Sequence, residues 1–124
     1  MKVRVLYDDV GCWNVKDGFF KEMKEAGIEV YAFLRVAFPV FTSKVNYRNH
    51  RKIIVIDGKV GFMGGMNIAD RYDKGTSWGT WRDTHFKFVG KGVHGLQSVF
   101  LIDWYVVSKK ALERSDLLSG RPNL

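Results

Sequence analysis

The chain begins with an alternation of polar and apolar residues in "KVRVLY", where Val3, Val5 and Tyr7 fall on one side. A period of two is typical of a β-strand. Over residues 15–26 the apolar positions recur instead at helical spacing among Lys and Glu, and Gly27 follows where a helix is expected to end. The run "IEVYAFL" then predicts a second strand. Strand, helix and strand in this order predict a parallel βαβ unit.

A β-hairpin is predicted over residues 51–63, with Asp57 and Gly58 as its turn. Asp-Gly favours a type I′ turn because both central residues of that turn need a positive φ. Beyond Arg51 and Lys52 both faces of this strand are apolar, so we expect a central strand with helices over each face of its sheet. A two-residue turn fixes the cross-strand pairs, which are Ile56 with Lys59, Ile54 with Gly61, Lys52 with Met63, and His50 with Gly65.

The rest of the chain completes an α/β fold. Residues 34–49 have no clear period and mix aromatic with basic side chains, which predicts a long basic aromatic loop. Residues 84–89 alternate as a further strand. Over residues 93–110 the apolar positions form one stripe of a helix, with Trp104 in the core. We expect residues 1–124 to form a single domain that includes this loop.

The composition limits the possible functions. A chain of 124 residues with 46% hydrophobic content can form one core of ordinary size. No stretch of about 18 residues lacks charges, which predicts a soluble chain. The single cysteine, Cys12, excludes an intrachain disulfide and a cysteine zinc cluster, and we interpret it as a small buried hydrophobe. The net charge of +7 fits nucleic acid, an anionic membrane surface, a phosphorylated substrate or an ordinary basic surface.

A cluster of polar groups is expected at the open end of the hairpin. The predicted register brings His50 and Lys52 beside Gly64, Gly65 and Asn67. An imidazole, an ammonium, an amide and backbone N–H groups suit a tetrahedral phosphate, because histidine can attack phosphorus while lysine and asparagine hold its oxygens. The arrangement requires no metal and no cofactor. The alternative is that these residues simply start a strand, and the nearby Gly-Gly-x-Asn turn weakens it.

Asp57 is expected at the opposite end of the hairpin. It lies roughly 23 Å from His50 along a straight strand, at about 3.3 Å per residue. This distance gives Asp57 a turn-anchoring role rather than a direct contact with the histidine.

The residues of this hairpin resemble the phospholipase D superfamily, whose motif is His-x-Lys-x4-Asp followed by a glycine-rich turn and an asparagine. The motif stands here as His50, Lys52 and Asp57, followed by "GFMGGMN". The flanking stretches "FTSKVNYRNHRKIIVIDGKVGFMGGMNIADRY" and "WRDTHFKFVGKGVHGLQSVFLIDWY" are similar to the bacterial cardiolipin synthase family. The resemblance implies an α-β-α sandwich, in which a mixed sheet carries helices on both faces.

The resemblance also implies an activity and residue roles. The reaction would be phosphatidyl transfer between two phosphatidylglycerol molecules through a phosphohistidine. His50 would be the nucleophile or its acid/base counterpart, Asp57 would complete the catalytic motif, and Lys52 and Asn67 would bind phosphate with Gly64 and Gly65. An acidic residue orients the histidine in this family, and Asp83 is the candidate, although an ordinary loop aspartate is an equal interpretation. His85 and His94 match nothing in the motif and are interpreted as structural.

Two departures from the family leave other functions open. Family synthases carry two such motifs and transmembrane helices, whereas this chain has one motif and no span. We therefore expect one catalytic half of a bacterial cell-membrane enzyme, soluble as a fragment, which needs its second half or a homodimer partner. The alternatives are a homodimeric phosphodiesterase that acts on nucleic acid, and a phosphodiester-binding module without turnover. The loop is expected to dock on the anionic membrane surface through Arg35, Lys44 and Arg48.

Overall fold

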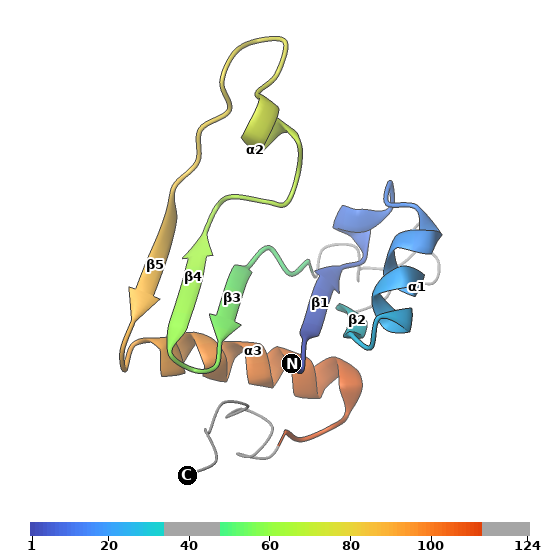
Figure 1. The fold of residues 1–124 in the computed structure, drawn as a ribbon, viewed down its shortest axis with the longest axis vertical. Helices are drawn as coiled ribbons and strands as arrows, with labels where there is room; N and C mark the ends of the chain where they lie inside the picture. Colours follow the sequence, from blue (N-terminus) through green and yellow to red (C-terminus); the bar gives the residue numbers. More distant parts are fainter. Residues whose placement is uncertain (34–47, 113–124) are drawn as a thin grey trace. The chain divides into compact units, whose positions relative to one another are not determined.

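The computed structural model describes residues 1–33 and 48–112 (Figure 1). Residues 34–47, most of the predicted basic aromatic loop, lie outside the described residues. The described chain falls into two compact units, which are residues 1–50 with 101–112, and residues 51–100. The α/β class expected from the sequence is confirmed, and the expectation of a single domain stays a prediction.

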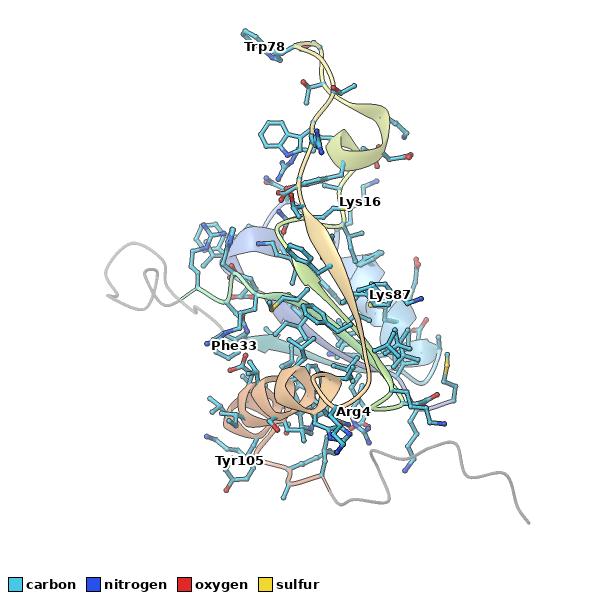
Figure 2. All side chains as sticks on the ribbon, turned by 90° about the vertical axis from the view of Figure 1, so that its left-hand side faces the viewer. Arg4, Lys16, Phe33, Trp78, Lys87 and Tyr105 are labelled. Atoms are coloured by element: carbon cyan, nitrogen blue, oxygen red, sulfur yellow. The ribbon has the colours of Figure 1, made fainter. Side chains whose placement is uncertain are left out.

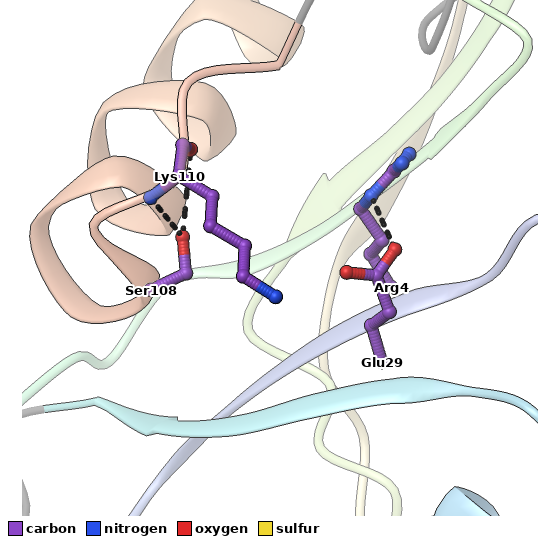
Figure 3. A network of polar contacts seen from close by, with 4 residues as sticks. All are labelled: Arg4, Glu29, Ser108 and Lys110. Atoms are coloured by element: carbon purple, nitrogen blue, oxygen red, sulfur yellow. Dashed lines mark hydrogen bonds and ion pairs between the residues drawn. The ribbon is translucent and has the colours of Figure 1, made fainter.

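The first unit contains the predicted βαβ arrangement. Strand β1 (Arg4–Asp8) pairs in parallel with strand β2 (Glu29–Phe33), and helix α1 (Asp17–Glu25) connects them after a short 3-10 helix, η1 (Val10–Cys12). An ion pair joins the two strands, with 3.1 Å between Nε of Arg4 and Oε1 of Glu29 (Figure 3). The parallel unit expected from the hydrophobic pattern is therefore confirmed.

Helix α1 ends as the sequence predicts. Gly27 has φ +82°, a conformation that costs glycine little because it has no Cβ. Its N–H donates to the carbonyl of Lys24, and the N–H of Ile28 donates to the carbonyl of Met23. These two hydrogen bonds satisfy carbonyls that would otherwise be left open at the helix end, which is the Schellman arrangement.

The second unit is built on an antiparallel three-stranded sheet with strand order β3-β4-β5 (Figure 1). Its strands are β3 (Lys52–Ile56), β4 (Val60–Gly64) and β5 (His85–Val89). Between β4 and β5 the chain extends beyond the strand ends and includes the short helix α2 (Arg71–Lys74). The predicted hairpin and the predicted fifth strand are therefore both present.

The register of the hairpin differs from the predicted one by a single residue. Ile56 pairs with Val60 instead of Lys59, and Lys52 pairs with Gly64 instead of Met63. The Asp-Gly turn does form, because Asp57 has φ 51° and the N–H of Lys59 donates to the carbonyl of Ile56. Lys59 then adds a third residue to the connection, and this extra residue shifts every later pair.

The prediction that β3 is a central strand, buried on both faces, is wrong for the described chain. In the order β3-β4-β5 it stands at the edge of its sheet. Ile54 and Ile56 on one of its faces are both about half exposed, and Val89 on the same face of β5 is also exposed. Ile53 to Ile56 are all apolar, but no described element of this unit buries the face that carries Ile54 and Ile56.

Helix α3 (Val93–Ser108) contributes to the core of each unit. In the second unit Val93 is buried, and a Cβ at Gly61 would lie 2.8 Å from Leu96, so the helix lies closely against the sheet there. In the first unit Trp104 is buried and contacts Tyr31 edge to face at 5.1 Å. The predicted apolar stripe and the core position of Trp104 are confirmed.

Candidate active site

The boundary between the two units falls between His50 and Arg51, so the residues of the motif belong to different units. In the first unit His50 is exposed at the end of a short irregular segment. The residue before it, Asn49, is held in place because its amide donates to Oδ2 of Asp103 on α3 at 3.0 Å. The segment that presents the histidine is therefore fixed to a helix by a charge-assisted hydrogen bond.

Arg48, at the end of the predicted basic loop, also has a partner in the first unit. Its Nε lies 3.2 Å from Oδ2 of Asp8 at the end of β1. Its guanidinium is therefore committed to an ion pair, while Arg35 and Lys44 lie outside the described residues. Membrane docking through this loop stays a prediction.

In the second unit, Lys52, Gly64 and His85 form one row across the sheet. Lys52 pairs with Gly64, and Gly64 pairs with His85. Directly paired residues share a face, so the lysine and the histidine project to the same side, two strand spacings or roughly 10 Å apart. A Cβ at Gly64 would lie 2.7 Å from Nδ1 of His85, which means that the imidazole leans over the glycine. A side chain larger than that of glycine at this position would collide with Thr84 and His85.

His85, which the sequence interpretation treats as structural, lies in the same row as Lys52. Its Nδ1 atom is buried and, within the part of the chain that the structure describes, has no hydrogen-bond partner. The motif does not include this position, so only the observed register reveals that His85 belongs to the row of Lys52.

Gly65 and Asp83 are also brought together. A Cβ at Gly65 would overlap the carboxylate of Asp83. The carboxylate is oriented locally, because its Oδ1 accepts the N–H of Thr84 at 2.7 Å. The N–H of Gly65 donates to the carbonyl of Thr84 at 3.0 Å and so already has an acceptor. Phosphate binding by Gly64 and Gly65, and the orienting role of Asp83, stay predictions.

Asn67 lies just beyond the end of β4 and contacts Tyr72 at the start of α2. The Asn67 amide donates to the phenolic oxygen of Tyr72 at 3.1 Å. This hydrogen bond, helped by the nearby guanidinium of Arg71, lowers the pKa of Tyr72 below its usual value. Both residues line a shallow surface hollow, which is formed by Met66, Asn67, Ile68, Ala69, Asp70, Tyr72 and Asp73. Tyr72 therefore fixes which way the Asn67 amide faces, and no sequence signal identified it.

Asp57, the third residue of the motif, lies in the turn at the opposite end of the hairpin. Lys52 is the first residue of β3, so it lies at the end of the strand away from Asp57. Residues 1–33 and 48–112 contain no group of three or more His, Cys, Asp or Glu side chains placed to hold a metal ion. The described residues also include no helix of the length and apolar character needed to span a membrane.

Comparison with known proteins defines the family. The family model described as "Cardiolipin synthase, PLD-like domain" matches residues 1–74. The chain is 47% identical over 96% of its length to a cardiolipin synthase of Geobacillus kaustophilus, and 44% identical over 96% to cardiolipin synthase 2 of Bacillus cereus. It covers 24% and 23% of those relatives. No solved structure matches the chain.

The family match places the chain in the class of phospholipase D-like domains. The chain belongs to the cardiolipin synthase, PLD-like domain family, because the family model matches more than half of it. It spans about a quarter of the length of the curated relatives that it matches.

Proposed function

We propose that the chain is one catalytic half of a phosphatidyltransferase that forms cardiolipin from two phosphatidylglycerol molecules. The 47% identity to a cardiolipin synthase over 96% of the chain carries this proposal. The complete His-x-Lys-x4-Asp spacing at His50, Lys52 and Asp57 agrees with it. Because the chain corresponds to about a quarter of that relative, the activity is proposed for the protein that contains it.

The first step forms a phosphohistidine. A ring nitrogen of His50 attacks the phosphorus of phosphatidylglycerol, the bond from phosphorus to the glycerol oxygen breaks, and that oxygen takes a proton from a second histidine. Lys52 and Asn67 hold the non-bridging oxygens as negative charge develops. Asp83 accepts the other ring N–H of His50, which fixes the tautomer and stabilises the charged imidazole.

The second step transfers the phosphatidyl group. A hydroxyl of another phosphatidylglycerol attacks the phosphorus, gives its proton to the second histidine, and the nitrogen–phosphorus bond breaks to release cardiolipin. Gly64 and Gly65 support this chemistry through their size, because side chains there would collide with His85 and Asp83.

The second histidine must come from a copy of the motif other than the one that contains His50. Family enzymes carry a second motif, so the other half of a longer chain or a second copy of this chain would supply it. Neither His85 nor His94 lies in such a motif.

The full α-β-α sandwich belongs to the same proposal. Ile54, Ile56 and Val89 are exposed apolar side chains on the same sheet face as Lys52, Lys87 and His85. An exposed apolar area on a sheet normally packs against another layer. A helical layer over the end of this face that carries Ile56 and Val89, away from the row of Lys52, would complete the sandwich of the family.

The site of action would be the bacterial cell membrane, because phosphatidylglycerol resides in the bilayer. The net charge of +7 supports an anionic membrane surface as the partner.

A homodimeric phosphodiesterase that acts on nucleic acid is the second candidate. The basic charge and the single motif favour it. Cleavage of single-stranded DNA by the purified chain, lost in His50→Ala, together with no transfer from phosphatidylglycerol, would favour this candidate. If the chain is instead a phosphodiester-binding module without turnover, it would bind phosphodiesters but never yield a phosphohistidine.

The experiment combines solution mass with trapping of the intermediate. The chain is incubated with phosphatidylglycerol labelled at phosphorus and denatured in alkali, in which a phosphohistidine survives. His50→Ala is compared with His94→Ala, since His94 is an exposed histidine on α3. We expect a dimer that becomes covalently labelled and turns over phosphatidylglycerol. Labelling and turnover should both be lost in His50→Ala and retained in His94→Ala. Label that persists in His50→Ala would contradict the proposal. If the isolated chain is an inactive monomer, the same two variants are tested in the longer protein that contains it.

A further inference from the structure

The connection between β4 and β5 projects two apolar side chains into solvent. We call residues 65–84 the α2 loop; it extends beyond the ends of both strands (Figure 1). Trp78 is 96% exposed and stands at the far end of the loop (Figure 2), and Ile68 is fully exposed. Single exposed apolar side chains are common on protein surfaces, but these two are almost completely exposed and both lie on one projecting loop.

The tip that carries Trp78 is a turn in which three backbone N–H groups are hydrogen-bonded within the turn. The N–H of Thr76 donates to the carbonyl of Gly79 at 2.8 Å, and the N–H of Gly79 donates back at 3.0 Å. The N–H of Trp78 lies 3.3 Å from the hydroxyl oxygen of Thr76. The turn therefore satisfies these three backbone N–H groups within itself, which lowers the cost of moving it into a less hydrated region.

A cationic and aromatic layer lies between the tip and the base of the loop. The guanidinium carbon of Arg71 lies 5.2 Å from the ring centre of Tyr72 and 5.4 Å from that of Trp81. The two rings meet edge to face at 6.2 Å. Tyr72 in turn accepts the amide N–H of Asn67. The layer thus connects the apolar tip to a residue of the candidate phosphate site.

This order of groups matches the interface of a bilayer. Tryptophan and tyrosine concentrate where headgroups meet acyl chains, and arginine binds the phosphates above them. Asn67 shares its surface hollow with the apolar side chains of Met66 and Ile68 and with the carboxylates of Asp70 and Asp73, so the lining of the hollow is both apolar and polar.

We propose that the α2 loop is a membrane anchor, in which Trp78 and Ile68 enter the headgroup region of an anionic bilayer. The identification of the bilayer as the source of the substrate rests on the proposed function. A fluid bilayer accepts single apolar side chains without a complementary shape, whereas a stable protein interface needs roughly 800 Å² on each partner. The chain's net charge of +7 attracts the anionic surface.

The α2 loop itself carries no net charge. A salt series can therefore distinguish insertion of its apolar side chains from electrostatic adsorption of the whole chain. Its three basic residues are matched by three acidic ones, and these are Arg71, Lys74 and Arg82 with Asp70, Asp73 and Asp83. The contribution of Trp78 to binding should therefore persist at high salt. The attraction due to net charge should weaken there.

The test is flotation of the purified chain with vesicles of phosphatidylglycerol and phosphatidylcholine, at low and high salt. Trp78→Ser and Ile68→Ser should each lower the vesicle partition coefficient about tenfold. Trp13→Ser and Ile102→Ser are the matched controls, because these side chains are 52% and 64% exposed but lie outside the loop. Both controls should bind like the wild type, and circular dichroism checks that all four variants are folded.

Trp78→Phe adds a readout of depth. It should retain vesicle binding but lose the part of the tryptophan fluorescence that lipids with brominated acyl chains quench. Equal binding of Trp78→Ser and wild type, or no binding of the wild type, would overturn the proposal. A change of solution mass in Trp78→Ser without a change of vesicle binding would also overturn it, because a second copy would then cover the tip. Flotation reports vesicle binding whether or not the chain turns over phosphatidylglycerol, so a loss of binding and an absence of phosphatidyl transfer are separate results.

Discussion

Asp83 and Gly65 lie so close together that a methyl group on the glycine would overlap the aspartate carboxylate. The Thr84 N–H holds that carboxylate in place. In Gly65→Ala, the Asp83 side chain must therefore move, and we expect a loss of about 1–3 kcal/mol in the free energy of unfolding. Chemical denaturation measures this loss.

Two further glycine variants make that result interpretable. Gly95→Ala on α3 should raise stability by roughly 0.5–1 kcal/mol, because a Cβ there meets nothing within 4 Å. Gly64→Ala should cost more than Gly65→Ala, since its Cβ would strike the backbone of Thr84 and His85 rather than a movable side chain. If Gly65→Ala were as stable as the wild type, the close approach of Asp83 would be wrong.

The hydrogen bond from Asn67 to Tyr72 predicts a coupled titration. The bond lowers the pKa of Tyr72, so Asn67→Ala should raise that pKa towards the ordinary value. The titration is followed by NMR of chains with labelled tyrosine, and the Tyr72 signal is assigned by its absence in Tyr72→Phe. Because the folded pKa is the lower one, any stabilisation from this group exists above the ordinary tyrosine pKa and disappears as pH falls through the folded value.

Ser98→Ala on α3 is the control variant for Asn67→Ala. It also removes a polar group, but the Ser98 hydroxyl donates to the carbonyl of His94 within its own helix. It should leave the Tyr72 titration unchanged. A Tyr72 pKa that does not respond to Asn67→Ala would mean that the amide does not contact the phenol in solution.

Strong local periodicity made much of the fold predictable. The alternation that ends at Tyr7 and the helical stripe that contains Trp104 each reflect burial along a whole element, so the βαβ unit and helix α3 followed from the sequence. Gly27 marked the end of α1 because its left-handed conformation is a property of glycine itself.

Register and exposure were not predictable from the same pattern. The Asp-Gly pair identified the turn, but the extra residue, Lys59, depends on how the hairpin packs. One such contact is tight, since a Cβ at Gly58 would lie 3.2 Å from the side chain of Gln97. The one-residue shift matters for the candidate site, because it places Gly64 rather than Met63 opposite Lys52. The shift opens the row that includes His85.

Asp57, the third residue of the motif, lies in the hairpin turn. Its position predicts that it stabilises the turn rather than contacts the substrate. With φ 51°, it adopts a conformation that asparagine and aspartate tolerate well and β-branched residues do not. Asp57→Asn should therefore change the free energy of unfolding by less than about 0.5 kcal/mol, while Asp57→Val should cost about 1–2 kcal/mol. Thermal unfolding compares them. Equal stability of the two variants would remove the turn-anchoring role.

The surroundings of Cys12 predict an unreactive thiol. Partial burial raises its pKa, and the carboxylates of Asp8 and Asp9 raise it further by repelling the thiolate. The sequence interpretation of Cys12 as a small hydrophobe agrees with this environment. We expect iodoacetamide to alkylate Cys12 more slowly in the folded chain than in denaturant at the same pH, because only the thiolate reacts.

The pH profile of alkylation gives the sign of the effect. The half-maximal rate should occur at a higher pH in the folded chain than in the unfolded one. Because the folded pKa is raised, the stabilisation is fully present below the unfolded pKa and is lost as pH rises through the folded value. Asp9→Asn should move the profile towards lower pH by removing one repelling charge, whereas Asp73→Asn, on the exposed part of α2, should not move it. A profile that does not move in Asp9→Asn would show that this carboxylate does not reach the thiol.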